Sequence, residues 1–482
     1  AATGHATVDV GGVAGDSSLV LSFGDVMALS GDYFVADGYP MIAPPGAASR
    51  AEGLAAEGLF QLAAVTGERG QWAGTRDEVI GALKVMAVDQ MVEDPRFAPG
   101  GEFQHFEFSP TAAETEVEQR VRDRFLALGA SNDDHFVAPG ARGPATEADR
   151  PATRFGSAGE AYRWLHQRAL DDAWQLGRDG GDISRAMARE AAAQHYLTDA
   201  FAAGHLRTPV AAMREFWQER YPWFWEGLRR KVASDTAAAL RELVAPLRLV
   251  PPSVLYDRTL GAVRARTSGY PRVSLGDLLA KVFHDWDNTH GLILEGGGML
   301  FGDGCLDQGV TRSLALAAVR AGVDDVEVAF ALGASGKSPS GRELYQAVRD
   351  RTGAPTGPRF AAETRIPRVS PDNQTQNWWA PDVESLWETP IVGATGTTVG
   401  EAVAEALDVG QELPRRLECL GRRIADFMAL PPIPGLRQWV SGKACQAYQR
   451  GFVAGLAADP RGAVLACVGG LDAQPATMAS AS

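Results

Sequence analysis

The sequence predicts a mainly α-helical protein, a large irregular helical bundle with long loops. Long segments rich in Ala, Leu, Arg and Glu repeat their apolar residues at three- and four-residue steps, as helices with one buried face do. Few segments show the β-branched alternation that is typical of strands. Clusters of Gly and Pro separate the helical segments and indicate loops. With 482 residues, of which 45% are hydrophobic, the chain can bury a sizeable core.

Seven segments show this helical periodicity most clearly. They are residues 112–130, 158–177, 184–203, 230–247, 274–291, 310–323 and 399–429. In the second of them, Tyr162, Leu165 and Ala169 fall on one face, which we expect to point inward. Ser274 is expected to begin its helix as the N-cap, with Asp277 at the position that a capping box gives to Glu or Gln.

Loops are predicted at residues 38–49, 138–153 and 333–342, with a long excursion over residues 351–382. The motifs described below lie before residue 305. We therefore predict one domain over residues 1–305 and a mainly helical C-terminal extension over residues 306–482, either separate or packed into the same domain.

Three glycine-rich stretches lack the spacing of nucleotide-binding loops. Gly336-Lys337-Ser338 has Ala331 where a phosphate-binding loop needs a glycine, and Pro339 follows where the helix would have to be under way. Residues 294–304 and 393–400 have no strand and helix around them that would suit a dinucleotide, so we interpret both as turns.

Charge and composition limit the classes of partner. The formal net charge of −14 gives no general attraction to phosphate backbones or anionic membranes, and no nucleic-acid partner is expected. No apolar run approaches the roughly 18 residues that span a bilayer. The first residues, AATGHATVDV, favour a chain from which a signal peptide has been removed, and hence a secreted or periplasmic protein, over a chain that was shortened otherwise. The four cysteines form no CxxC pair, and either one or two disulfides or buried free thiols would fit them.

The segment AAAQHYLTDAFAAGHLRTP, residues 191–209, carries the strongest chemical signal. His195 and Asp199 stand four residues apart, so on a helix they share one face with Cβ atoms about 5–6 Å apart, and one divalent ion can bind both. His205 would lie about 15 Å beyond His195 on a straight helix. Either the helix bends near Gly204, or His205 serves a second ion. The spacing favours a multinuclear metal site over a single ion.

Other stretches repeat the combination of imidazole and oxygen donors. In VFHDWDNTHG, His284 shares a helix face with Asp287 and Asn288. His135 occurs in the polar segment ASNDDHFVAP, and His5 lies near the first residue. Further candidates are the carboxylates of Asp25 and Asp32, whose seven-residue spacing would place them on one face of a helix.

Imidazole and carboxylate groups without thiolate suit zinc best among the common ions. A gathering of carboxylates and imidazoles also needs a cation to relieve its repulsion and desolvation. The competing interpretation is structural. A lone histidine such as His166 or His105 is more often a hydrogen-bonding residue than a ligand, and Asp199 could instead pair with Arg207.

The segment HYLTDAFAAGH resembles the central motif of the zinc-dependent phospholipase C superfamily, which includes the single-strand-specific zinc nucleases. In that superfamily an H-x3-D-x5-H motif supplies ligands to a trinuclear zinc cluster. The order of the flanking pieces is also similar, with ALSGDYF, DDHF and HDWDN in the places of the family's aspartate, His-Phe and second helix. The stretches GDVMALSGDYF and HYLTDAFAAGHLR look closest to the phosphatidylcholine-hydrolysing branch. The resemblance covers roughly residues 20–305.

The resemblance implies a set of zinc ligands, with two or three zinc ions. They are His5, Asp32, His135, His195, Asp199, His205, His284, Asp287 and Asn288. The sequence departs from the family at two positions, and the chain beyond about residue 305 has no counterpart in it. Position 288 is Asn instead of Glu or Asp, so either Asn288 or Asp287 takes that role. The first residue is Ala1 instead of Trp, which leaves His5 as the candidate for the third ion.

The implied reaction is zinc-assisted hydrolysis of a phosphodiester, most closely that of phosphatidylcholine or a similar phospholipid. Asp32 or Asp25 would orient or deprotonate the water, and Arg207 would hold a phosphate oxygen. Tryptophans in ERYPWFWEG and QNWWAPDVESLWE suit a choline headgroup or transient contact with a membrane surface, although most such aromatic residues belong to cores. No obligate protein partner is evident. The alternatives are a zinc-dependent single-strand nuclease or nucleotidase and a non-catalytic, metal-stabilised binding protein.

Overall fold

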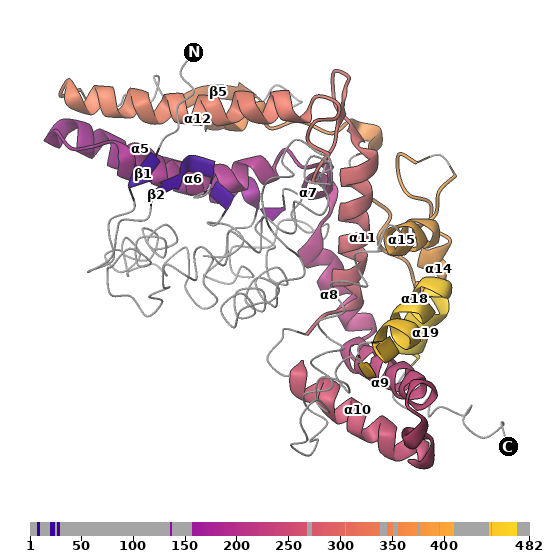
Figure 1. The fold of residues 1–482 in the computed structure, drawn as a ribbon. Coiled ribbons are helices and arrows are strands. Elements are labelled where there is room, and N and C mark those ends of the chain that lie inside the picture. Colours follow the sequence, from indigo (N-terminus) through magenta and orange to yellow (C-terminus); the bar gives the residue numbers. More distant parts are fainter. Residues whose placement is uncertain are drawn as a thin grey trace, which may run out of the picture. The chain divides into compact units, whose positions relative to one another are not determined.

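The computed structural model describes residues 7–9, 20–24, 27–28, 135–136, 157–267, 272–303, 305–337, 345–349, 355–373, 376–394, 396–408, 443–444 and 446–469. Within them the chain is mainly helical, which confirms the predicted fold class at that level (Figure 1). The predicted helix over 112–130 and the predicted loops over 38–49 and 138–153 lie outside the described residues.

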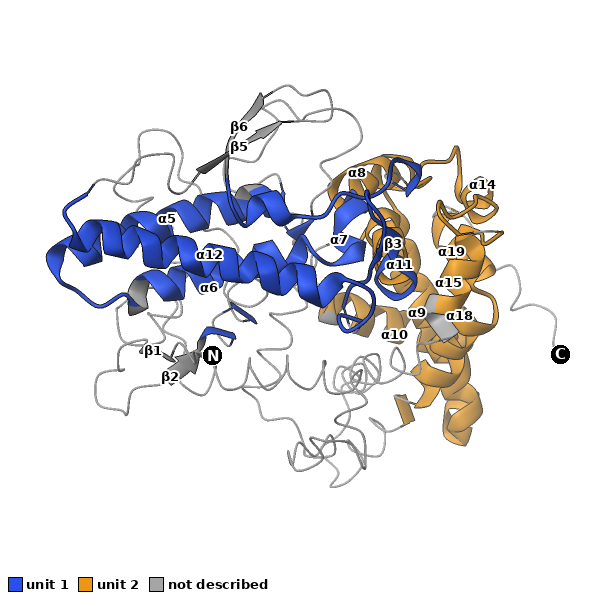
Figure 2. Ribbon diagram, turned by 90° about the horizontal axis from the view of Figure 1, so that it is seen from above, with its two compact units in different colours: residues 1–209, 287–374 blue, residues 210–286, 375–482 orange. Residues whose placement is uncertain are grey.

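The chain forms two compact units, coloured separately in Figure 2. Unit 1 comprises residues 1–209 and 287–374, and unit 2 comprises residues 210–286 and 375–482. Residues 306–374 belong to the same unit as the central HYLTDAFAAGH motif, and residues 375–482 belong to the other.

The described residues of unit 1 form three long helices, a short helix and small antiparallel strand pairs. Its elements are β1 (Thr7–Asp9), β2 (Val20–Ser22), α5 (Ala158–Asp179), α6 (Ser184–Asp199), α7 (Ala203–Arg207), β3 (Leu292–Ile293), β4 (Met299–Leu300), α12 (Thr311–Ala334), β5 (Tyr345–Arg349), β6 (Pro355–Phe360), and the 3-10 turns η4 (Glu363–Arg365) and η5 (Pro371–Asn373). The strand pairs are β1–β2, β3–β4 and β5–β6.

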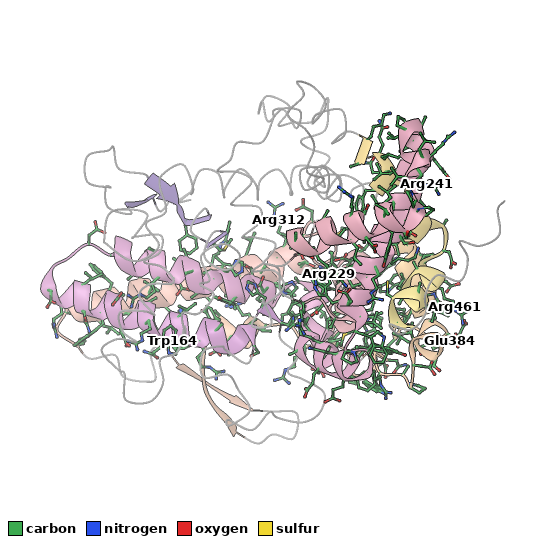
Figure 3. The ribbon with its side chains drawn as sticks, turned by 90° about the horizontal axis from the view of Figure 1, so that it is seen from below. Trp164, Arg229, Arg241, Arg312, Glu384 and Arg461 are labelled. Atoms are coloured by element: carbon green, nitrogen blue, oxygen red, sulfur yellow. The ribbon has the colours of Figure 1, made fainter. Side chains whose placement is uncertain are left out.

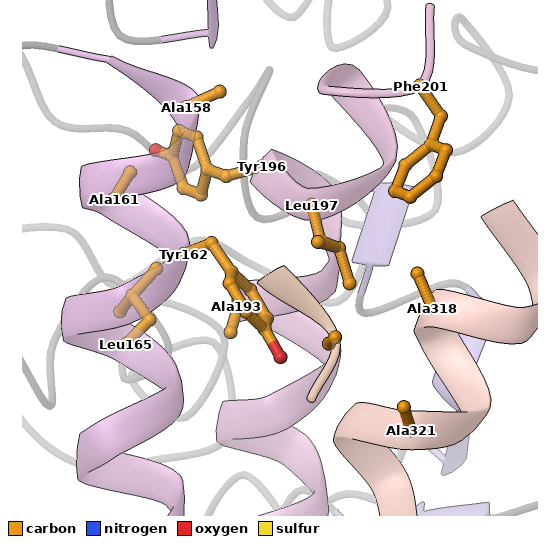
Figure 4. Close-up of a cluster of buried hydrophobic side chains, with 11 residues drawn as sticks. Ala158, Ala161, Tyr162, Leu165, Ala193, Tyr196, Leu197, Phe201, Ala318 and Ala321 are labelled. Carbon is orange, nitrogen blue, oxygen red and sulfur yellow. The ribbon is translucent and has the colours of Figure 1, made fainter. Parts of the chain in front are cut away.

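Helices α5, α6 and α12 pack side by side and enclose the core of unit 1 (Figure 4). The predicted inward face of α5 is confirmed, because Tyr162 and Ala169 are fully buried and Leu165 is 2% exposed. Helix α12 continues to Ala334, eleven residues beyond its predicted end. Its close contact with α5 explains the extension, since a Cβ atom on Gly333 would overlap the carbonyl of Trp174.

Unit 2 is built from shorter helices around α9. Its elements are α8 (Val210–Arg220), α9 (Phe224–Leu243), η3 (Ala245–Leu249), α10 (Pro252–Arg266), most of α11 (Leu275–His290), α14 (Val383–Trp387), α15 (Val399–Asp408), the π-helical turn η6 (Gln449–Val453), α18 (Ala454–Ala458) and α19 (Pro460–Val468). Helix α9 packs against α10, η6 and α19.

Two local features of unit 2 follow from its sequence. The predicted capping box is present, since Ser274 Oγ accepts a hydrogen bond from the Asp277 N–H at 3.1 Å and Asp277 Oδ2 accepts one from the Ser274 N–H at 2.7 Å. Arg229, labelled in Figure 3, places its guanidinium 4.8 Å from the centroid of the Trp225 ring, a cation–π distance.

Several boundaries differ from the prediction. Helix α9 begins at Phe224, before the predicted residue 230, and gives way to η3 after Leu243. The predicted excursion over 351–382 contains β6 as well as η4 and η5. Helix α15 matches the start of the predicted helix 399–429, and residues 409–429 lie outside the described residues.

Cys467 is a buried free thiol, and burial raises its pKa to about 12. No single helix in the described part of the chain has the length and apolar composition to cross a membrane. One pair, Gln446–Ala458 and Pro460–Val468, passes that test by length and composition when taken together, with a bend of 103° between them.

Candidate metal centre

The helix that carries His195 ends at Asp199, and this break shapes the site. The next residues turn, and α7 starts at Ala203. The N–H of Ala203 donates to the carbonyl of Phe301 at 3.3 Å, and the N–H of Gly204 donates to Asn288 Oδ1 at 2.6 Å. Because these N–H groups bond to residues distant in the sequence, the helix cannot continue through them. The bend, one of the two alternatives considered for His205, therefore exists, and it lies before Gly204.

Three donor atoms converge beside the end of α6. His135 Nδ1 lies 2.9 Å from Asp199 Oδ2 and 3.1 Å from His195 Nε2, and His195 Nε2 lies 3.5 Å from Asp199 Oδ2. A tetrahedral zinc ion with bonds of about 2.0–2.2 Å holds its ligand atoms roughly 3.3–3.6 Å apart. The His195–Asp199 separation has this spacing and the other two are slightly shorter, and the group His135, His195 and Asp199 could hold a metal ion.

The hydrogen bond on the far side of the His195 ring sets its tautomer. His195 Nδ1 lies 3.0 Å from the carbonyl oxygen of Met27. A carbonyl can only accept, so Nδ1 carries a proton, and Nε2 is the ring nitrogen that faces His135 and Asp199 and can bind a metal once it is unprotonated. Metal-binding histidines in proteins are held in the same way, by an acceptor on the other ring nitrogen.

One carboxylate oxygen of Asp199 is buried with its hydrogen-bonding capacity unfilled. Its Oδ2 atom is buried and has no hydrogen-bond partner among the described residues, although two imidazole nitrogens lie within 3.5 Å. Burial alone would raise the pKa of Asp199, but the charges of His195 and His135 outweigh burial and lower it. The carboxylate is therefore kept ionised in a place where a cation would complete its bonding.

His205 is oriented by a second carbonyl. Its Nδ1 lies 2.9 Å from the backbone oxygen of His135, and its ring stacks on Phe136 with 4.6 Å between centroids. The Nε2 lone pair then points away from the carbonyl, toward Asp303, whose Oδ2 lies 4.0 Å away. His205 Nδ1 is also 3.8 Å from Asp199 Oδ1, so the break after α6 replaces the long separation of a straight helix by close proximity.

Asp303 is a site residue that the sequence did not reveal, since residues 294–304 were interpreted as a turn. Pairing of β3 with β4 and a hydrogen bond from the Gly302 N–H to the Asn288 carbonyl at 3.0 Å bring it there. Its Oδ2 also accepts a hydrogen bond from Asn288 Nδ2 at 3.0 Å, and 60% of its side chain is exposed. Only the FGDG sequence after the hairpin could have drawn attention to this carboxylate.

Asn288 and Asp287, two predicted ligands, are engaged elsewhere. Asn288 Oδ1 caps the start of α7 by accepting the Gly204 N–H, and its amide nitrogen donates to Asp303. Both oxygens of Asp287 accept hydrogen bonds from Arg207, at 2.7 Å from Nε and 2.5 Å from Nη2. Because these hydrogen bonds occupy the side-chain oxygens of both residues, the geometry favours structural roles for Asp287 and Asn288.

The same bonds change the interpretation of Arg207. It is 4% exposed, holds Asp287 with two nitrogens, and donates from Nη1 to the Asn373 carbonyl at 3.0 Å. A guanidinium so occupied is poorly placed to bind a phosphate oxygen. The sequence also allowed an ion pair between Asp199 and Arg207, but Arg207 pairs with Asp287 instead.

The remaining predicted residues are placed as follows. His284 lies on α11 in unit 2, half-buried, with Nδ1 2.9 Å from Asp285 Oδ1, and its role as a ligand stays a prediction. His5, Asp25 and Asp32 lie outside the described residues. Among the aromatic residues considered for a headgroup, Phe224 and Trp378 are 2% exposed and belong to the core of unit 2, whereas Trp379 is 47% exposed.

Comparison with known proteins adds no relative. No protein-family model, no curated protein and no solved structure matches the chain. The candidate centre is therefore described by its own geometry alone.

Proposed function

We propose that this chain is a zinc-dependent phosphodiester hydrolase of the phospholipase C type, acting on phosphatidylcholine or a similar phospholipid. The observation that carries the proposal is the convergence of His135 Nδ1, His195 Nε2 and Asp199 Oδ2 within 3.5 Å of one another. The resemblance of HYLTDAFAAGH to the central motif of that superfamily supplies the reaction.

The donor set suits zinc, because it combines neutral imidazoles with a carboxylate and contains no thiolate. When bound, such an ion supplies a Lewis acid that polarises the phosphodiester and makes water acidic enough to attack near neutral pH. The chain's own contribution is orientation. The Met27 and His135 carbonyls fix the rings of His195 and His205, so that their Nε2 lone pairs need no reorganisation before binding.

In this proposal Asp303 stands beside His205 as an acidic ligand candidate, and Asp25 or Asp32 keeps the predicted role of orienting the water. Arg207 has a positioning role instead of binding phosphate. By holding Asp287 and the Asn373 carbonyl, it fixes the end of α7 directly after His205.

One observation favours the non-catalytic alternative, a structural metal site. His135 and His195 are only 3% and 7% exposed, and structural sites surround the ion with protein groups. Asp199, with 15% of its side chain exposed, is the most open member of the group and the place where water or substrate would enter.

The test is hydrolysis by the full chain after chelation and zinc return. Phosphatidylcholine in mixed micelles and single-stranded DNA serve as substrates, with His195→Ala and Asp199→Ala as site variants and His290→Ala, on the exposed end of α11, as a control. The proposal predicts zinc-restored release of phosphocholine, at least about a hundredfold lower in both site variants. Cleavage of DNA but not lipid would establish the nuclease alternative. A zinc-loaded chain that cleaves neither would establish the structural site.

A further inference from the structure

A second cluster of polar groups lies inside unit 1, away from the candidate metal centre. His166 on α5 is fully buried and has a carboxylate on each side of its ring. Nδ1 lies 2.6 Å from Glu190 Oε2 on α6, and Nε2 lies 3.5 Å from Asp325 Oδ2 on α12. One imidazole thus joins all three long helices of the unit.

The surroundings of His166 are apolar and closely packed. The Tyr162 ring stacks on it at 5.0 Å between centroids, and the Phe360 ring meets it edge-on at 4.5 Å. Tyr162 belongs to the cluster of buried side chains drawn in Figure 4, and Phe360 belongs to a second buried cluster with Leu170 and Val326. In such a medium, charge interactions are strong and an uncompensated charge is costly.

Nδ1 is hydrogen-bonded to Glu190, whereas Nε2 faces Asp325 at 3.5 Å without a hydrogen bond. A carboxylate can only accept, so Glu190 requires a proton on Nδ1. A neutral ring would then turn the Nε2 lone pair toward the Asp325 carboxylate, which is repulsive at 3.5 Å. A proton on each nitrogen removes this repulsion, and it places one positive charge between two negative ones.

The other titratable groups that face the ring do not supply a competing cation. On α5, Tyr162 carries a hydroxyl whose pKa burial raises well above its ordinary value, with further contributions from Glu190, Asp325 and Glu363. Glu363 on η4 pairs with Arg163, at 2.7 Å from Nη2. Burial alone lowers the pKa of His166, but the charges of Glu190 and Asp325 and their bonds to the ring raise it to about 9.

Close packing keeps the carboxylate of Glu190 in place. It accepts a hydrogen bond from the side-chain amide of Gln194, one turn further along α6. A Cβ atom on Gly322 of α12 would come under 3.0 Å from Gln194 Nε2, Glu190 Oε1 and the Tyr162 hydroxyl. The missing side chain at position 322 therefore leaves α12 close enough for Asp325 to reach the ring.

We propose that His166 is a buried imidazolium that clamps α6 between α5 and α12 and releases it at alkaline pH. On α6, Gln194 directly precedes His195, and Glu190 lies one turn before Gln194. The clamp therefore fixes the helix whose last turn carries His195 and Asp199. The clamp does not depend on metal or on hydrolysis, and it holds whether or not the proposed function is correct.

The sign of the pH dependence follows from the raised pKa. An unfolded histidine has a pKa near 6.5, whereas folded His166 titrates at about 9. The clamp's contribution to stability is fully present below pH 6.5 and is lost as the pH rises to about 9.

The experiment is urea unfolding of the full chain with chelator present, from pH 6 to pH 10, for the wild type and His166→Gln. His290→Gln serves as the histidine control because position 290 is exposed. The difference between wild type and His166→Gln is expected to be largest near pH 6, to shrink as the pH rises, and to level off near pH 9. A difference that is constant with pH overturns the proposal.

Two carboxylate variants keep the test decisive if His166→Gln does not fold. Asp325→Asn and Glu190→Gln each remove one charge beside the ring while preserving the shape of the substituted side chain. Both are expected to move the end of the alkaline decline from about pH 9 to lower pH, and Glu190→Gln more, because Glu190 lies closer to the ring. If the decline in both variants still ends near pH 9, as in the wild type, the proposal is wrong.

Discussion

Arg207 and Asp287 form a buried, two-point ion pair, with Nε 2.7 Å from Oδ2 and Nη2 2.5 Å from Oδ1. The side chains are 2% and 0% exposed. Arg207 is the last residue of α7 and lies two residues after His205. Its partner, Asp287, lies in the last turn of α11. The pair therefore anchors the segment that presents His205, and it occupies groups that the sequence suggested for phosphate and metal.

Replacing Arg207 by Met is expected to destabilise the protein strongly. The variant leaves the Asp287 carboxylate buried without its cation, which typically costs about 3–5 kcal/mol. Arg312→Met is the matched control, because Arg312 pairs with Asp307 on the surface, where ion pairs contribute about 0–1 kcal/mol. Urea unfolding measures both. Equal losses in the two variants would show that the buried pair does not anchor α7.

Asn288→Asp separates a capping role from a ligand role. An aspartate cannot donate to Asp303, and it would bring two carboxylates together at a distance of about 3 Å. We expect the metal-free variant to lose about 1–3 kcal/mol of unfolding free energy without gaining metal affinity. Tighter binding of zinc by the variant would instead identify position 288 as a ligand position.

Gly302→Ala tests the packing that places Asp303. A Cβ atom at position 302 would overlap the side chain of Asn288, so the segment after β4 would have to move away from Asn288. The expected loss is about 1–3 kcal/mol, as for other overpacked sites. Gly261→Ala on α10 has open space around the new Cβ atom and should be neutral or stabilising by up to about 1 kcal/mol. The contact is unimportant if the two variants unfold at the same urea concentration.

The helices of the fold could be predicted because their signals are local. The inward face of α5 and the capping box at Ser274 both depend on residues within one or two turns. The ending of α6 could not, since DAFAAGH has no Gly or Pro before Gly204 to mark it. The break depends on hydrogen bonds to Phe301 and Asn288, about a hundred residues away in the sequence.

In the candidate site, too, the features set by local spacing could be predicted, and those set by contacts between distant residues could not. The four-residue spacing of His195 and Asp199 predicted a shared ion, and the structure brings their donor atoms to 3.5 Å. Asp303 could not be predicted, because the β3–β4 pairing and the hydrogen bond from Gly302 to Asn288 carry it to His205. The choice between Asp287 and Asn288 as a ligand depended on partners that the sequence does not show, namely Arg207 and Gly204.

Metal affinity is expected to fall in acid because the imidazoles become protonated. Two neutral histidines are needed, so protons compete with the metal, and the affinity should drop by up to about tenfold per pH unit for each imidazole that takes up a proton. Asp199 contributes little to this decline, since its neighbours lower its pKa and keep it ionised to lower pH. Zinc titration between pH 5 and pH 8 measures the slope. A flat profile would mean that the metal binds outside the histidine group.

The most direct test of the account is the amount of cobalt or zinc bound per chain at neutral pH, for the wild type, His195→Gln, Asp199→Asn and the control Asp179→Asn. Asp179 is an exposed residue at the end of α5. If His135, His195 and Asp199 hold an ion, both site variants lose at least one equivalent that the wild type and the control retain, and they lose its ligand-field absorption with cobalt. Unchanged metal content in His195→Gln and Asp199→Asn would contradict the account.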